Sequence, residues 1–286
     1  MGVHSNSPIE VDNNNRKVKE VQIHMAKTIK EIAQLLNEAT AYEDWMEDIQ
    51  NDERSGVQKA WQQWKNRMEK REKLKEEHRL KVSFDASFLP FEGAFVAGVD
   101  EAGRGPLAGP VVTAAVILPT DCEALIGIND SKQLSKNMRE AFAKTIKEHA
   151  ISYSIHFQSP EEIDRLNIYE ATKQSMKASI ETLDVQPHYV IIDAMTLPIQ
   201  IPQKSIIKGD AKSLAIAAAS ILAKQARDQY MENLHKQYPH YGFDQNAGYG
   251  TKQHLEALDQ YGPTEHHRKS FEPIKSMFIK QGALPI

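Results

Sequence analysis

The sequence has a single cysteine, Cys122, among 286 residues. One thiol excludes an intrachain disulfide and a cysteine-based zinc site, and no nucleophile motif surrounds it. We expect Cys122 to be a small side chain in a reducing compartment. No run of about 18 apolar residues is present, which excludes a membrane-spanning helix. The polar first residues lack a signal-peptide core, and Asn6 stands where a myristoylation motif needs Ser or Thr, so we expect a cytoplasmic protein.

The chain also lacks an excess of positive charge. It carries 35 Lys and Arg against 39 Asp and Glu, a net charge of −4. An acidic protein of this kind can bind nucleic acid only through local basic patches. One candidate runs from Lys59 to Lys81, where nine Lys or Arg stand against four Glu. This segment is either a solvated helix face, a surface for a phosphate backbone or a docking site for a protein partner.

The composition changes along the chain in a way that predicts three parts. Residues 1–20 are Asn-rich and poor in large apolar groups, which is typical of a disordered tail. Residues 21–85 are expected to form a basic helical N-terminal module, in which Thr28 and Glu31 have capping-box spacing. Its apolar stripe repeats at helical intervals: Val57, Trp61, Trp64 and Met68. A second, larger domain is expected over residues 93–286.

The second domain alternates between strand and helix patterns. Apolar or alternating runs predict strands at 94–99, 110–118, 151–158, 188–193 and 204–210. A helix is expected from Pro160, capped by Ser159, to about Leu183, and an alanine-rich helix over 211–234. Strands mixed with helices in this order predict an α/β fold with a mixed sheet.

Acidic residues end three of the predicted strands. They are Asp100 with Glu101, Asp193, and Asp210. Each alone could be a turn or helix-cap residue. Together at one sheet edge, however, four carboxylates would repel strongly unless cations lay between them. Hard oxygen donors suit Mg²⁺ or Mn²⁺, and a pair of such ions can activate a water and stabilise a leaving oxygen at a phosphate.

A glycine-rich loop directly follows the first pair of acids. In GRGPLAGP, Gly103 and Gly105 allow backbone groups to approach a ligand, and Arg104 adds a permanent cation. The loop is not a nucleotide P-loop, because it lacks the Lys-Ser/Thr that ends that motif; it could also be only a tight connection between strands. Adjacent His266 and His267 have poor metal-ligand spacing, so we expect surface or supporting residues rather than ligands.

Six segments in a fixed order resemble bacterial ribonuclease HII. They read GVDEAGRGPLAGPVVTAAVIL, NDSKQLS, VIIDAM, IIKGDAKSLAIAAASILAKQARD, NAGYGTKQHLEAL and HRKSFEPIK. The resemblance extends over residues 93–278, and the N-terminal segment is similar to an extension found in some members. It implies a ribonuclease H-like mixed sheet flanked by helices, with a small helical N-terminal module. Ala247 is a departure, because many members have lysine there.

The resemblance also implies an activity. The expected enzyme is a metal-dependent endoribonuclease of the ribonuclease H type 2 class, using Mn²⁺ or Mg²⁺. It would hydrolyse the RNA strand of RNA–DNA hybrids and incise duplex DNA 5′ of embedded ribonucleotides, by two-metal-ion catalysis that leaves 3′-OH and 5′-phosphate ends. Its partners would be these nucleic acids and no membrane, and we expect a monomer. The alternative is a non-catalytic nucleic-acid-binding protein with the same fold, against which the intact set of four acids argues.

The family's functional positions carry over to nine residues. The catalytic and metal-binding positions are Asp100, Glu101, Asp193 and Asp210. The substrate-binding positions are Gly103, Arg104, Gly105, Lys132 and Tyr249. In the family the Gly-Arg-Gly segment touches the ribonucleotide 2′-OH, and the tyrosine packs on the next deoxyribose. Without the resemblance, Tyr249 could be an ordinary aromatic beside a turn and Lys132 a solvated loop lysine.

Overall fold

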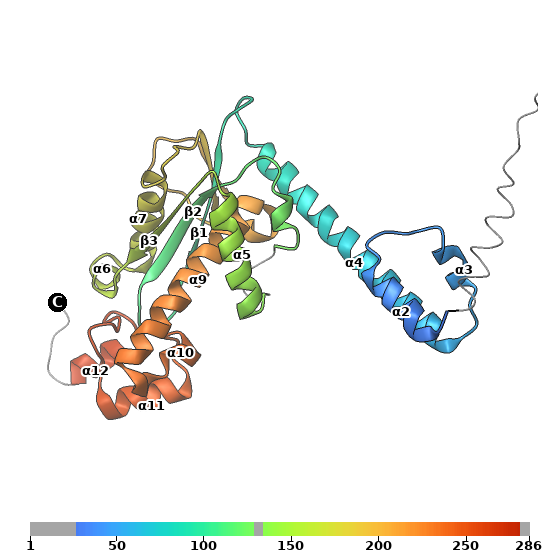
Figure 1. Ribbon diagram of the computed structural model, residues 1–286. Helices are drawn as coiled ribbons and strands as arrows, with labels where there is room; N and C mark the ends of the chain where they lie inside the picture. Colours follow the sequence, from blue (N-terminus) through green and yellow to red (C-terminus); the bar gives the residue numbers. More distant parts are fainter. Residues whose placement is uncertain (1–26, 129–133, 281–286) are drawn as a thin grey trace, which may run out of the picture. The chain divides into compact units, whose positions relative to one another are not determined.

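The computed structural model describes residues 27–128 and 134–280 (Figure 1). The predicted tail, residues 1–20, and the predicted phosphate contact Lys132 lie outside these ranges. The chain divides into two compact units between Lys75 and Glu76, inside the long helix α4 (Ser55–Ala86). The last turns of α4 therefore belong to the second unit.

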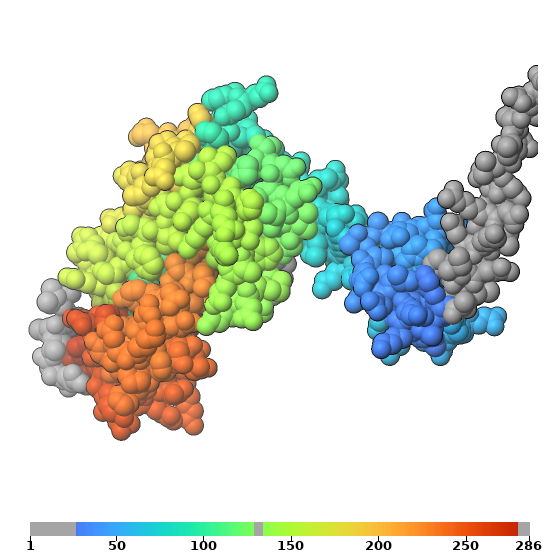
Figure 2. Space-filling model, in the orientation of Figure 1, coloured from blue at the N-terminus to red at the C-terminus, as the bar shows by residue number. Residues whose placement is uncertain are grey.

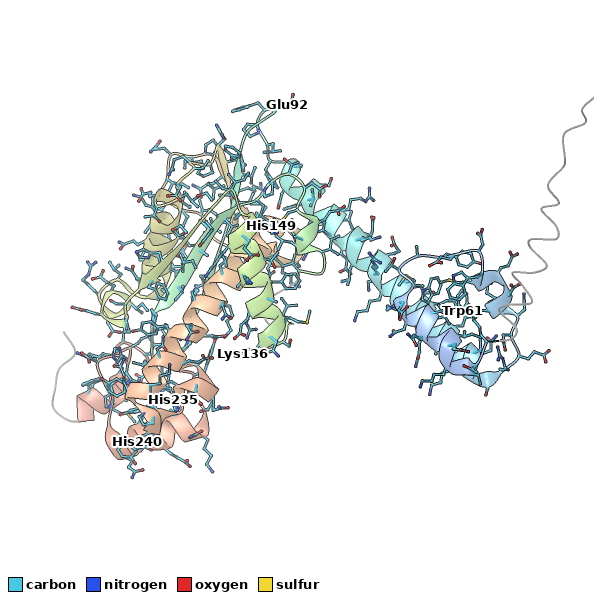
Figure 3. The ribbon with its side chains drawn as sticks, viewed as in Figure 1. Trp61, Glu92, Lys136, His149, His235 and His240 are labelled. Carbon is cyan, nitrogen blue, oxygen red and sulfur yellow. The ribbon has the colours of Figure 1, made fainter. Side chains whose placement is uncertain are left out.

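The first unit packs short helices on the beginning of α4. Helices α2 (Ile29–Glu38) and α3 (Met46–Gln50) precede it. The predicted capping box is present, because Thr28 accepts from the Glu31 N–H while the Glu31 carboxylate accepts from the Thr28 N–H at 2.7 Å. The predicted apolar stripe forms the core, in which the rings of Trp61 (labelled in Figure 3) and Trp64 stack with centroids 4.8 Å apart.

The second unit contains a five-stranded mixed sheet. Its strands are β1 (Val96–Ala102), β2 (Val111–Ile117), β3 (Ser152–Gln158), β4 (Tyr189–Asp193) and β5 (Gln203–Ile206). The spatial order is β3-β2-β1-β4-β5. β2 pairs antiparallel with both β1 and β3, whereas β1–β4 and β4–β5 are parallel. The predicted mixed sheet is therefore confirmed, and β1 is its central strand.

Helices cover both faces of this sheet. The helical elements are η1 (Glu123–Leu125), α5 (Lys136–His149), α6 (Pro160–Leu166), α7 (Ile168–Glu181), α8 (Gly209–Lys212), α9 (Leu214–Gln237), η2 (Pro239–Tyr241), α10 (Phe243–Asn246), α11 (Lys252–Tyr261) and α12 (Ile274–Lys280). One face packs on α7, and the other on α9 with α5 beside it (Figure 1). Alternate residues of β2 serve the two cores, since Ala114 contributes to one and Ala115 to the other.

Helix α9 packs closely on β1 because the side chains that face each other are small. A side chain at Gly98 would collide with the backbone of Ala215. Ala217, Ala218 and Ala219 are fully buried on the same helix. This close approach brings α9 alongside the acidic end of β1.

Two predicted helices are each broken into two. The helix expected from Pro160 to Leu183 is interrupted at Asn167, whose φ of 71° is left-handed and whose side chain accepts from the Tyr169 and Glu170 N–H groups. It therefore caps α7 and ends α6. The helix expected over 211–234 is interrupted at Ser213, which caps α9 by accepting from the Ile216 N–H at 3.0 Å. In both cases a side-chain cap overrides a continuous helical pattern.

The C-terminal part of the second unit forms a lobe around the end of α9. Helices α10, α11 and α12 surround buried Tyr241 and Phe243, and the orange-to-red surface of Figure 2 shows this lobe. Among the described residues, none of the helices has the length and apolarity needed to traverse a lipid bilayer.

Candidate active site

Two carboxylates lie side by side on neighbouring strands: Asp193 is the last residue of β4, and Asp100 lies two residues before the end of β1. In the parallel pairing of β1 with β4, Val99 lies opposite Ile192. The next residue on each strand is an aspartate, Asp100 on β1 and Asp193 on β4. Parallel strands present their carboxyl ends at the same sheet edge, so the fold brings these predicted site residues together.

Asp100 is buried and electrostatically stressed. Asp100 as a whole is only 6% exposed to solvent. Burial raises the pKa of Asp100 well above its usual range, and the negative charges of Glu101 and Asp193 raise it further. Hydrogen bonds from the Ser220 hydroxyl on α9 and from the Glu101 N–H at 2.7 Å act in the opposite direction. The site thus holds more negative charge than its protein surroundings neutralise.

Glu101 is partly compensated by the following loop. Burial raises the pKa of Glu101, the cation of Arg104 lowers it, and Asp193 raises it. Arg104 Nη1 lies 3.4 Å from Oε1 of Glu101, whose side chain is 15% exposed. Oε2 of Glu101 is buried without a hydrogen-bond partner among the described residues. Such a buried carboxylate oxygen is costly unless something donates to it or coordinates it.

The residue before Asp210 is hydrogen-bonded to the Asp193 carboxylate. The N–H of Gly209 donates to Asp193 Oδ1 at 2.7 Å, and Asp210 follows in the first turn of α8. The predicted strand over 204–210 was therefore too long: β5 ends at Ile206, and Asp210 lies in a short helix and does not end a strand. The turn into α8 requires a left-handed residue, Lys208, with φ of 55°. The half-buried Asp210 carboxylate accepts from the Ala211 N–H at 2.9 Å.

These oxygens suit a hard divalent cation. Across residues 27–128 and 134–280, no three carboxylate, histidine or cysteine side chains stand close enough together to hold a metal ion as they are placed. The donor chemistry nevertheless fits, because Glu101 Oε2 lacks a partner and Asp193 raises the pKa of both Asp100 and Glu101. A metal site at Asp100, Glu101, Asp193 and Asp210 stays a prediction.

The glycine-rich loop leaves β1 immediately after the acids. Gly103 has a φ of 90°, and a side chain there would collide with the Arg227 guanidinium. Glycine is therefore required at this position for both backbone conformation and space. The Arg104 side chain is 41% exposed, so its cation remains accessible beside the acids.

Tyr249 lies against the same loop. A Cβ built on Gly105 would be 3.5 Å from Tyr249 Cε1, an ordinary packing distance. Tyr249 is 49% exposed, and its loop is tied to the glycine loop by the Leu107 N–H, which donates to Gly248 O at 2.8 Å. The structure thus brings the predicted residues Gly103, Arg104, Gly105 and Tyr249 together, next to the acids.

Sequence reasoning assigned no role to two buried arginines behind this loop. Arg227 and Arg268 are 1% and 0% exposed. Arg227 donates to the carbonyls of Pro110, Ala247 and Ala108 at 2.9–3.1 Å. Burial lowers the pKa of Arg227 to about 10 and that of Arg268 to about 9. The only signal was their place in segments quoted for the family resemblance.

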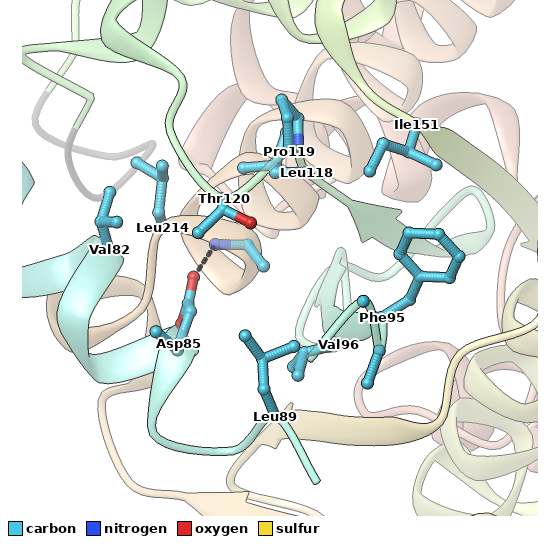
Figure 4. A pocket seen from close by; sticks show the side chains of 14 residues that line it. Val82, Asp85, Leu89, Phe95, Val96, Leu118, Pro119, Thr120, Ile151 and Leu214 are labelled. Carbon is cyan, nitrogen blue, oxygen red and sulfur yellow. Dashed lines mark hydrogen bonds between the residues drawn. The ribbon is translucent and has the colours of Figure 1, made fainter. Parts of the chain in front are cut away.

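A separate cavity lies at the other end of β1 (Figure 4). Its volume is about 140 Å³, and Asp85, Phe95, Val96 and Leu214 help to line it. Oδ2 of Asp85 accepts from the Ala215 N–H at 2.9 Å, which ties the end of α4 to the start of α9. None of the predicted site residues lines this cavity, so it is not the site of the acids.

Comparisons with known proteins identify the family. The family model described as Ribonuclease HII matches residues 97–274, and the model described as Ribonuclease HII N-terminal domain matches residues 28–89. Ribonuclease HII of Bacillus cereus (strain AH820) is 52% identical over 255 residues, covering 88% of this chain and 98% of the relative.

Solved structures share the fold. The ribonuclease H2 of Pyrococcus horikoshii OT3 superposes with a TM-score of 0.58 at 28% identity, over 65% of this chain and 98% of that one. Bst-RNase HIII in complex with Mn²⁺ gives a TM-score of 0.54 at 18% identity, over 71% and 72% of the two chains, which is a likeness of fold alone. The predicted ribonuclease H-like fold is confirmed. The chain belongs to the ribonuclease HII family and is a metal-dependent ribonuclease H of type 2.

Proposed function

We propose that this enzyme hydrolyses the RNA strand of RNA–DNA hybrids and incises duplex DNA on the 5′ side of embedded ribonucleotides. The observation that carries the proposal is the placement of Asp100, Glu101 and Asp193 at one sheet edge, directly beside the loop of Gly103–Gly105. Acids that can hold cations stand there next to backbone groups that can approach a sugar. Cleavage would leave 3′-OH and 5′-phosphate ends.

The acids hold the cations in this proposal. When bound, a pair of divalent ions lowers the pKa of a water and stabilises the departing oxygen of a phosphodiester. Asp100, Glu101, Asp193 and Asp210 would supply the oxygens that hold these cations, and Asp100 is the most buried of the four. Ser220 holds the Asp100 carboxylate in place from α9. Mn²⁺ or Mg²⁺ would serve, because both prefer such oxygens.

The glycine loop and Tyr249 would supply selectivity. The 2′-OH is what distinguishes RNA from DNA at a given site. Gly103, Arg104 and Gly105 would contact that hydroxyl largely through backbone groups, and the exposed Tyr249 ring would pack on the following deoxyribose. Lys132 would contact a phosphate.

The monomeric state and the cytoplasmic location also remain predictions.

The test is cleavage of a labelled DNA duplex that carries one ribonucleotide. Reactions with Mn²⁺, with Mg²⁺ and with EDTA are compared with an all-DNA duplex and with the Asp100→Asn variant. We expect metal-dependent incision 5′ of the ribonucleotide that the variant abolishes. Tight duplex binding without incision under either metal would instead identify a non-catalytic nucleic-acid-binding protein and would overturn the proposal.

A further inference from the structure

One short segment, residues 264–268, is hydrogen-bonded to the glycine loop and reaches the tyrosine loop (residues 247–251) through His254. The Gly109 N–H donates to His266 O at 2.9 Å, and the Arg268 N–H donates to Leu107 O at 2.8 Å. An isolated β-bridge joins Ala108 to His267. The segment is therefore paired by backbone hydrogen bonds to the end of the glycine loop.

Arg268 holds the loop itself. Its Nη2 donates to Gly103 O at 2.6 Å and its Nη1 to Arg104 O at 2.8 Å. Nε and Nη2 donate to Gly109 O at 3.0 and 2.9 Å. A guanidinium has a rigid planar fork of donors, so these bonds set where the carbonyls of Gly103 and Arg104 point.

The neighbouring residue, His267, reaches the tyrosine loop through a second histidine. His267 and His254 are 1% and 0% exposed, and their Nε2 atoms lie 3.0 Å apart. His267 Nδ1 accepts from the Thr264 N–H at 2.9 Å. His254 Nδ1 lies 2.9 Å from the carbonyl oxygen of Tyr249, which can only accept.

These partners determine both tautomers. Because His267 Nδ1 accepts, a neutral His267 carries its proton on Nε2 and donates to His254 Nε2. His254 then carries its proton on Nδ1 and donates to Tyr249 O. Burial lowers the pKa of both histidines, that of His267 to about 3, so both are neutral at physiological pH. The result is one directed chain from Thr264 to Tyr249.

We propose that His267 and Arg268 are positioning residues that set the glycine loop and Tyr249 relative to each other, and so create the preference for a ribonucleotide. Arg268 orients the peptides that face the 2′-OH, and His267 acts on the Tyr249 backbone through His254. This inference rests on the proposed function, in which these two loops read the sugar. Both residues are buried and would act through the loops, not by contact with the substrate.

Two substitutions at His267 separate its two hydrogen bonds. The carbonyl oxygen of His267→Asn can replace Nδ1 and accept from Thr264, but the side chain cannot reach His254. The longer amide of His267→Gln can replace Nε2 and donate to His254. Arg268→Lys keeps a cation but loses the fork. His240→Gln (His240 is labelled in Figure 3) and Arg165→Lys, both at exposed residues, are matched controls.

The readout is binding preference in the Asp100→Asn background, where cleavage does not interfere. Fluorescence anisotropy gives Kd for a duplex with one ribonucleotide and for the all-DNA duplex. We expect His267→Asn and Arg268→Lys to reduce the ratio of these constants about tenfold, the effect of one or two hydrogen bonds. His267→Gln and both controls should keep the ratio within about threefold.

A double-mutant cycle distinguishes positioning from general stability. If His267 acts only by positioning Tyr249, then His267→Asn should lower the preference little further in a protein that already carries Tyr249→Ala. If His267→Asn instead causes general structural damage, its effect on the preference should add in full to that of Tyr249→Ala. An unchanged ratio in folded His267→Asn and Arg268→Lys overturns the inference, and if His267→Asn fails to fold, Arg268→Lys alone decides. No preference in the Asp100→Asn parent would instead contradict the proposed function.

Discussion

The backbone N–H of Gly209 donates to Oδ1 of Asp193 at 2.7 Å. A Cβ at Gly209 would lie 2.6 Å from Ile216 Cδ1 and 3.2 Å from the same Asp193 oxygen. We expect Gly209→Ala to displace the Asp193 carboxylate, and to lower kcat and the apparent affinity for Mn²⁺ about tenfold. Titrating cleavage with Mn²⁺ measures both.

The double variant Gly209→Ala/Ile216→Val separates the two contacts. Shortening Ile216 relieves its clash with the new methyl group but leaves the contact with Asp193. We therefore expect the double variant to regain thermal stability while kcat stays low. Recovery of full activity would show that Ile216 packing, and not the carboxylate, limits Gly209→Ala.

Neutralising Asp100 should stabilise the fold while abolishing cleavage. Burial, Glu101 and Asp193 all raise the pKa of Asp100, so its charged form is unfavourable in the folded protein. In metal-free buffer at pH about 8, relief of about 1 kcal/mol in Asp100→Asn would raise Tm by about 2–4 °C. A group whose folded pKa is raised costs stability as pH rises, so the gain should shrink toward acid pH.

Added Mn²⁺ provides the control for this prediction. A cation that binds only the folded state raises its stability. Wild-type Tm should therefore rise with Mn²⁺ more than that of Asp100→Asn. A metal-free Tm that falls in the variant would contradict the view that this acid is strained by its neighbours.

Asp85 predicts a second pH effect, away from the catalytic acids. Burial raises its pKa to about 6, and its Oδ1 has no hydrogen-bond partner among the described residues. Between pH about 4 and about 6 the folded protein holds a proton that the unfolded chain has released, so Asp85 destabilises the fold as pH rises. Asp85→Asn removes this dependence.

Urea unfolding of wild type and Asp85→Asn at pH about 4 and about 7.5 tests this. Between pH about 4 and about 7.5, the free energy of unfolding of the variant should improve relative to wild type by about 2–3 kcal/mol. The Asn carbonyl oxygen can still accept from the Ala215 N–H, so any change in that bond is a constant offset. Asp184→Asn, at an exposed aspartate, is the control. Parallel stability profiles for wild type and Asp85→Asn would exclude a protonated Asp85.

The basic face of α4 carries the prediction about nucleic-acid affinity. Arg67 is half-buried and donates to Leu36 O at 2.6 Å, so it supports the first unit's own fold, whereas Arg71 is exposed and makes one bond of this kind, to Thr40 O at 3.1 Å. The following cations are exposed, and they are the residues to replace with Ala: Lys70, Arg71, Lys73 and Lys75. If this face contacts phosphates, duplex affinity should fall and the slope of log K against log[salt] should flatten by about 0.9 per lost contact.

Neutral residues on the same helix give the matched control. Gln62, Gln63 and Asn66 are exposed, and replacing them with Ala changes the helix surface but not its charge. Their affinity and slope should equal those of wild type. If the variant that lacks the four cations also keeps the wild-type affinity and salt slope, this face of α4 does not contact phosphates and is either solvated or bound by a protein partner.

Local patterns were sufficient for much of the architecture. The capping box of Thr28 and Glu31, the strand patterns and the mixed sheet were all predicted, because each depends on residues close together in the chain. Asp100 and Asp193 were placed near strand ends for the same reason.

The placement of Asp210 at the end of a strand was wrong, because β5 ends at Ile206 and Asp210 lies in the first turn of α8. The continuous helix over 160–183 was wrong, since a single left-handed residue, Asn167, caps a new helix within an otherwise regular pattern.

The supports of the site were decided only by the tertiary structure. Arg268 lies 165 positions from the Gly103 carbonyl that it holds, and His254 and His267 lie 13 apart on different segments. A buried arginine or histidine is satisfied by whichever carbonyls the folded loops bring to it, and no periodicity encodes that meeting. The sequence by itself determined which residues could do the chemistry; the packing of distant loops decided how they are held.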